Sequence, residues 1–253
     1  MKPYLLTIWW ISIWAFVPEN ACGGNLLTDP VADSSRASVA TTRFTSRLNS
    51  MGMFNYGGRI VSNNPSADFM YVREGRHLSV QAFKAFDLYD LHTDMNFMAA
   101  FLYKNLSAGK RLVVSPGVGF VVQQLHSIAD RGSDLAARVV LSYKISAELT
   151  LEHTALVTNL ALKTEDLDWV NRFRITYSKK SIDASLSVWH NNKVFDNAAY
   201  LTTALSLTYA RVRISDHLLL NTGITSVIMP YSNNKELNPK KNGLFLTIAA
   251  VVH

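Results

Sequence analysis

Residues 138–154 have the sequence RVVLSYKISAELTLEHT, in which apolar and polar side chains alternate. One face of this stretch carries only aliphatic or aromatic side chains: Val139, Leu141, Tyr143, Ile145, Leu149 and Leu151. The alternation is interrupted once, at Ser146-Ala147, and a period of two is the period of a β-strand. The stretch therefore predicts two antiparallel strands that are joined by a tight turn and share one apolar face.

The same alternation recurs along most of the chain after residue 43. This region contains no window with the 3.6-residue period of a helix and no apolar run as long as a membrane helix. Each strand with its connection takes about 17 residues, enough for strands of about 9–11 residues that cross a bilayer. We predict twelve strands, near 44–57, 67–73, 76–88, 93–105, 110–124, 135–145, 147–161, 168–178, 181–192, 198–211, 215–229 and 242–253.

Connections between these strands alternate between short and long. Tight turns are expected at Glu74-Gly75, Ser107–Gly109, Ser146-Ala147, Lys179-Lys180 and Arg213-Ile214. The connections between them are mostly longer and more polar, and residues 230–241 are an example. The pattern predicts an all-β fold, a transmembrane antiparallel up-and-down β-barrel of about 12 strands, with 10–14 as the range.

Five tyrosines occur once per predicted hairpin, each a few residues before a tight turn: Tyr71, Tyr103, Tyr143, Tyr177 and Tyr209. A tyrosine has an apolar ring and a polar tip, so a ring of tyrosines at one height marks a membrane interface. We expect these five to form a membrane-interface girdle. The alternative is that tyrosine simply favours strands.

The composition excludes several other classes of protein. Among 253 residues only 17% are charged, and 25 Lys and Arg against 19 Asp and Glu give a net charge of +6 without a basic block. Nucleic acid is therefore not an expected partner. A single cysteine excludes a disulfide framework and a cysteine-rich zinc site, and neither a metal nor another cofactor is expected.

The first residues have the order of a cleavable secretory signal. Lys2 precedes a mostly apolar stretch from Tyr4 to Val17, and small residues follow. We predict a signal peptide over 1–23, a flexible periplasmic lead-in over 24–43 and the transmembrane barrel over 44–253. The fate of Cys22 stays open between lipidation and removal with the signal.

In these features the chain resembles the bacterial outer-membrane β-barrel superfamily, over residues 44–253 and the signal. The resemblance is one of pattern, without a named subfamily, and one departure is that the chain ends in His253 instead of an aromatic residue. The resemblance implies the bacterial outer membrane as the location. It also implies outer-membrane lipid, lipopolysaccharide and the barrel assembly machinery as partners.

If the apolar faces contact lipid, the charged faces line the interior. The candidates for pore-lining residues are Arg47, Asp94, Arg111, Lys144, Glu148, Glu152, Arg172, Arg174, Asp183 and His217. Both signs of charge occur, so the interior is either closed by ion pairs or open as a narrow channel for small polar or anionic solutes. A twelve-stranded family of acidic-sugar channels uses arginines in this way, but no unbroken row of arginines is visible along these strands.

Three other interpretations remain. A soluble β-sandwich would show the same alternation with its faces exchanged, but long strands and one-sided loops argue against it. A non-conducting structural or partner-binding barrel would use its extracellular loops, the basic loop at 230–241 first. A lipid-acting hydrolase would need a serine near His190, but Asn191 and Asn192 follow it, so we assign no catalytic residue and expect no enzyme.

Overall fold

The computed structural model describes residues 40–91, 95–123, 135–160, 167–193, 198–236 and 241–252. The predicted signal peptide (1–23) and residues 24–39 of the predicted lead-in lie outside the described residues. In the described ranges, no helix is long and apolar enough to cross a membrane.

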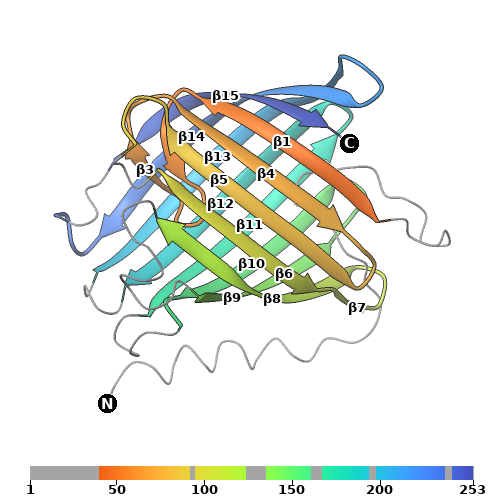
Figure 1. Ribbon diagram of the computed structural model, residues 1–253, viewed down its shortest axis with the longest axis horizontal. Helices are drawn as coiled ribbons and strands as arrows, with labels where there is room; N and C mark the ends of the chain where they lie inside the picture. The colour runs from red at the N-terminus through yellow and green to blue at the C-terminus, as the bar shows by residue number, and fades with distance from the viewer. Residues whose placement is uncertain are drawn as a thin grey trace.

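The described chain forms a closed antiparallel barrel, as predicted (Figure 1). Its strands are β1 (Thr41–Asn49), β4 (Ser66–Glu74), β5 (Leu78–Asp87), β6 (Phe97–Lys104), β8 (Leu112–Gln123), β9 (Leu135–Lys144), β10 (Leu149–Thr158), β11 (Asp168–Lys179), β12 (Ile182–Lys193), β13 (Ala198–Arg213), β14 (Leu218–Ser232) and β15 (Gly243–Val252). Three shorter strands are β2 (Gly52–Phe54), β3 (Arg59–Ser62) and β7 (Leu106–Ala108).

The pairing of the first strand, β1, with the last strand, β15, closes the ring. Strand β1 lies between β4 and β15, and β6 pairs with β8. Strand β7 continues β6 along β8 in the same register, since Tyr103 is opposite Gly117 and Leu106 is opposite Val114. The break between β6 and β7 lies beside Pro116, which has no N–H to donate to a neighbouring strand. Counting β6 and β7 as one strand, the barrel has the twelve strands that the alternation predicts.

The outer surface of the barrel is a belt of exposed aliphatic side chains. Leu205, Leu244 and Leu246 are each at least 60% exposed, and the other outward positions of these strands are mostly apolar as well. Exposure of this much apolar surface to water would be unfavourable by about 25 cal/mol per Å². The belt therefore faces lipid, and the alternative of a soluble β-sandwich is wrong.

Short and long connections lie at opposite ends of the barrel. Turns of two to four residues join β4 to β5, β9 to β10, β11 to β12 and β13 to β14, and we call their end the short-turn end. The turn at residues 109–111, between β7 and β8, lies at the same end, and the remaining connections between barrel strands lie at the loop end. The first of them differs from the prediction, because the strand expected over 44–57 runs only from Thr41 to Asn49 and is followed by the separate hairpin β2–β3.

Candidate functional site: the arginine-lined lumen

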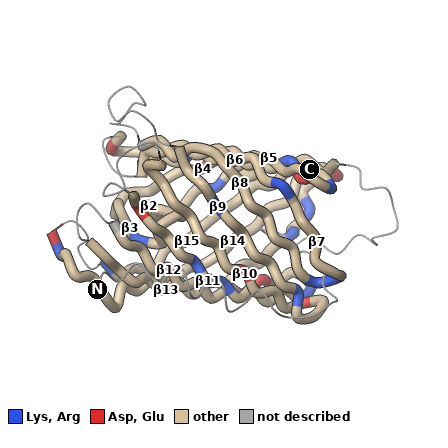
Figure 2. The backbone as a smooth tube through the Cα atoms, turned by 90° about the horizontal axis from the view of Figure 1, so that it is seen from below, with Lys and Arg blue, Asp and Glu red and all other residues tan. Residues whose placement is uncertain are grey.

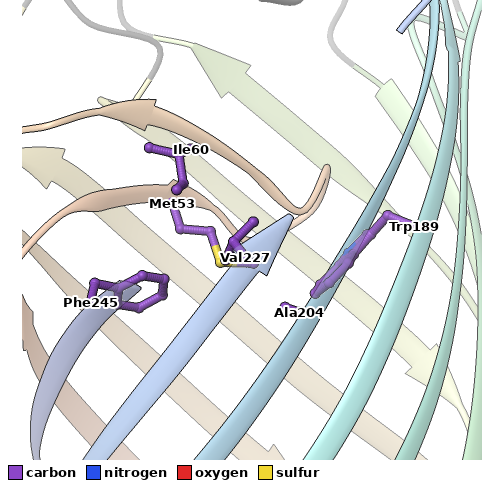
Figure 3. Packing of buried hydrophobic residues seen from close by; sticks show 6 residues of the cluster. All are labelled: Met53, Ile60, Trp189, Ala204, Val227 and Phe245. Atoms are coloured by element: carbon purple, nitrogen blue, oxygen red, sulfur yellow. The ribbon is translucent and has the colours of Figure 1, made fainter. Parts of the chain in front are cut away.

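The hairpin β2–β3 lies inside the barrel (Figure 3). Its two strands pair with each other and do not join the barrel sheet. Met53 and Ile60 of the hairpin pack with Trp189 of β12, Val227 of β14 and Phe245 of β15 in one buried cluster. Burial of apolar side chains of this size contributes about 1.5–3 kcal/mol each. The hairpin is therefore packed on the inner face of the wall that β12–β15 form.

The hairpin also contacts the opposite wall, formed by β4, β5 and β6. The ring of Phe54 lies 4.7 Å from that of Phe97 at 71°, an edge-to-face contact. The ring of Tyr56 lies 6.0 Å from Phe83 and 6.1 Å from Phe101. Because it contacts both walls, the hairpin crosses the lumen. It does so near the loop end of the barrel.

Two glycines allow the tip of the hairpin to approach β12 closely. The side-chain amide of Asn191 donates a hydrogen bond of 2.9 Å to the carbonyl oxygen of Gly57. Gly58 has φ +73°, and a Cβ added there would collide with the ring of Trp189. Glycine adopts this backbone conformation without steric cost, so Gly58 fits both the turn and the close contact.

Arg138 of β9 lies beneath Tyr56 and is only 3% exposed. Its guanidinium carbon lies 5.6–5.7 Å from the ring centres of Tyr56, Phe101 and Tyr103. It donates hydrogen bonds to the Tyr103 hydroxyl at 2.7 Å and to the side-chain Oε1 of Gln81 at 3.1 Å. Within the described residues, its direct contacts are thus to neutral groups, through cation–π interactions and hydrogen bonds.

Between the hairpin and the short-turn end, the barrel encloses a cavity of about 270 Å³. Its lining extends from Arg43 and Leu219 near the short-turn end to Met53, Asn55 and Tyr56 of the hairpin. Six arginines line it: Arg43, Arg47, Arg138, Arg172, Arg174 and Arg211. The carboxylates among the lining residues are Asp68 and Asp183. The strands therefore bring together a set of arginines that is dispersed in the sequence.

Arg47, Arg172 and Arg211 each form an ion pair. Arg47 Nε lies 2.6 Å from Asp68 Oδ1 and Arg211 Nη2 lies 3.4 Å from Asp183 Oδ1. Arg172 pairs with the buried Glu152 of β10.

Arg174 differs from these three arginines. It has no hydrogen bond or ion pair with any described residue, and its Nε atom is buried without a partner. Among the residues that the structure describes, the six arginines of the lining outnumber the carboxylates of Asp68, Asp183 and Glu152.

Small and mostly polar side chains form the wall from β12 to β15. The lining residues of this wall include Ser185, Ser187, Ala204, Ser206, Thr208, Gly223, Thr225, Thr247 and Ala249. Thr225 donates a hydrogen bond of 2.9 Å to the Ser206 hydroxyl, so these groups are partly paired along the wall. Their small volume leaves open space beside the arginines.

Four of the ten candidate pore-lining residues line the cavity: Arg47, Arg172, Arg174 and Asp183. Glu152 is buried beside them in its pair with Arg172. The structure places Arg111, Lys144, Glu148 and His217 in or next to the turns of the short-turn end, away from the cavity lining. Asp94 lies outside the described residues.

The candidate list omits several residues of the lumen. Arg138 and Asp68 lie on inward faces that alternation alone could have identified. Arg43 precedes the predicted start of the barrel at residue 44. Arg211 reaches the cavity through a register shift between Tyr209 and Val212, where its φ is +66°, and alternation gives no signal for such a bulge.

The structure places four of the five tyrosines of the predicted girdle on the outer face, and one inside the barrel. Tyr71, Tyr143, Tyr177 and Tyr209 are 37–57% exposed on the outer face, but Tyr103 is 5% exposed and bonded to Arg138 inside the barrel. The assignment of Tyr103 to the girdle is therefore wrong. Both faces of β6 are apolar, because its inward side packs against the hairpin, so alternation could not identify the lipid side.

His190 lies on the outer face of β12, exposed and opposite Asn171 of β11. Among the described residues, no group of three or more His, Cys, Asp or Glu side chains could hold a metal ion.

Comparison with known proteins identifies the fold. The chain matches no protein-family model and no curated protein. A solved KdgM porin is similar with a TM-score of 0.56 at 6% identity, and a KdgM porin in complex with disordered oligogalacturonate has 0.54 at 7%; each covers 83% of this chain and 98% of its own. A NanC porin has a TM-score of 0.52 at 9% identity, covering 84% of this chain and 98% of its own. The chain thus has the β-barrel fold of these porins, and the predicted fold is confirmed.

Proposed function

We propose that the protein is an outer-membrane channel for small anionic solutes. The observation that carries the proposal is the cavity lined by arginines, among them Arg174, which has no carboxylate partner among the described residues. Fixed cations in a narrow lumen attract anions and repel cations, because little water lies between the charges and the solute.

Arg174 is the side chain best suited to contact a passing anion. Arg47, Arg172 and Arg211 each share their charge with a carboxylate, whereas Arg174 has none in contact within the described residues. A guanidinium binds carboxylates and phosphates through two parallel N–H donors, so it recognises either group.

Similarity of fold supports a solute of this class. One of the similar solved structures is a KdgM porin in complex with oligogalacturonate, a chain of sugar carboxylates. Sugar hydroxyls could also exchange hydrogen bonds with the small wall of β12–β15. We therefore name short acidic sugars as the first solutes to test.

Planar bilayers with purified, folded protein test the proposal directly. We expect discrete current steps, and in a potassium chloride gradient a reversal potential that shows preference for chloride. In liposomes, trimers of a uronic acid should enter faster than neutral glucose trimers of similar size. Absence of steps would favour a non-conducting barrel, and preference for potassium would overturn the anionic selectivity.

Lys235→Gln is the matched control for charge. Lys235 lies in the connection between β14 and β15, outside the lining of the cavity. Its loss removes one positive charge without changing the lumen, so the reversal potential should stay where it is in the unmodified protein.

A further inference from the structure

Basic side chains outnumber acidic ones at the short-turn end. Nine lie in segments 73–77, 104–111, 144–148, 179–180 and 213–217, which we call the basic collar: Arg73, Arg76, Lys104, Lys110, Arg111, Lys144, Lys179, Lys180 and Arg213. The same segments contain three acids, Glu74, Glu148 and Asp216. The excess of six equals the net charge of the whole chain, +6.

The connections at the loop end have the opposite balance. Segments 50–65, 88–96, 124–134, 159–167, 194–197 and 233–242 contain six basic residues against eight acidic ones. Figure 2 shows several Lys and Arg positions at the end of the barrel near β7 and the C-terminus. The barrel therefore has a basic end and a slightly acidic end, which a general requirement for solubility does not explain.

Residues of the collar face outward at the height expected for lipid headgroups. Arg73 follows Tyr71 on the same face of β4, and Lys179 follows Tyr177 on the same face of β11, and all four are exposed. Two residues along a strand span about 6.6 Å. If the tyrosine rings lie at the edge of the hydrocarbon, the basic groups lie at the depth of the headgroup phosphates.

Few carboxylates of the protein neutralise the collar. Arg213 pairs with Asp216 of its own turn. In the described part of the chain, the other eight basic residues of the collar have no ion pair. Eight cations that have no ion pair with a described residue, arranged around one rim, are suited to an anionic surface that surrounds the barrel.

We infer that the basic collar binds the phosphate headgroups of anionic phospholipids in the leaflet around the short-turn end. Lys and Arg bind phosphate oxygens through charge-assisted hydrogen bonds, and a cluster near an anionic membrane surface adds their contributions. The outward direction of Arg73 and Lys179 favours lipid over a soluble polyanion, which would contact the turn tips instead. This inference does not depend on whether the lumen conducts.

Lipid enrichment around the full-length protein tests it. The folded protein is assembled into nanodiscs of phosphatidylcholine with a minor fraction of phosphatidylglycerol, and the lipids retained after ejection in a mass spectrometer are counted. We expect phosphatidylglycerol to be retained above its bulk fraction. The enrichment should fall in high salt, because salt screens exposed charges.

Pairs of variants locate the binding groups. Arg73→Gln with Lys179→Gln should lose most of the enrichment, whereas Lys235→Gln with Lys241→Gln, which removes two charges at the loop end, should retain it. Equal retention by the first pair and the unmodified protein would overturn the inference. Loss confined to the turn-tip pair Arg76→Gln with Lys180→Gln would also overturn it, because that pattern indicates a soluble polyanion. Heat-modifiable migration of each variant confirms that it is folded.

Discussion

The two walls of the lumen differ in what fills the space in front of them. In front of β4–β6 the hairpin packs on large apolar side chains such as Phe83, Phe97 and Phe101. In front of β12–β15, below the hairpin, small side chains such as Ser206 and Thr225 leave an open cavity. The number of strands thus sets only the largest possible width of the lumen. The volume of the inward side chains and the inserted hairpin decide how much of that space stays open.

The largest effect is expected from removal of the hairpin. Replacement of residues 51–64 by a short glycine-serine linker should raise single-channel conductance several-fold, because the element that spans the lumen is lost. Thermal stability should fall, since Phe83 and Phe97 become exposed to water. Unchanged conductance would mean that the hairpin does not restrict the ion path.

Loss of Arg174, which borders the open part of the cavity, should affect ion selectivity more than loss of Arg138, which the hairpin covers. Arg174→Gln removes a lining arginine that has no carboxylate partner among the described residues, so the reversal potential in a chloride gradient should move toward zero. Arg138→Gln should leave selectivity nearly unchanged, because Tyr56 and Tyr103 cover the guanidinium. It should lower the free energy of unfolding by about 2 kcal/mol through lost cation–π contacts and hydrogen bonds. The reverse ranking of the two variants in bilayer recordings would contradict this division of the lumen.

A smaller effect is expected where the hairpin meets β12. Gly58→Ala places a Cβ against the Trp189 ring at a position with φ +73°, so the tip should undock and conductance should rise, but less than after removal of the hairpin. Gly109→Ala is the matched control, since Gly109 has φ +70° in a turn at the short-turn end. Both variants should lose about 1–2 kcal/mol of stability from the left-handed backbone. An equal change in conductance for both would contradict the role of the Trp189 contact.

The smallest effect on conductance is expected when a larger side chain replaces a small one on the wall formed by β12–β15. Ser206→Leu adds volume to the cavity lining and should lower conductance modestly without changing the sign of selectivity. Leu207→Met, one residue away on the lipid-facing side, should leave conductance unchanged. A decrease in both variants would indicate a general loss of folded channels, which heat-modifiable migration on a gel can measure.

Alternation predicted most of the barrel because nearly every barrel strand has one face in lipid and one in a polar lumen. It identified the inward positions of Arg47, Arg172 and Arg174 from single strands. It failed at β6, where both faces are apolar, and therefore assigned Tyr103 to the wrong side. It also merged β2 into the first strand, because a short hairpin of mixed polarity has no period to separate it from its neighbour.

The sequence by itself determined the class of fold, the strand order and the two ends of the barrel. These features follow from local patterns, namely a period of two and the alternation of short and long connections. Only the tertiary structure decided that the hairpin enters the lumen, that Arg138 lies beneath its tip and that Arg174 has no carboxylate partner among the described residues. Those facts depend on contacts between side chains far apart in the chain, which no local period records.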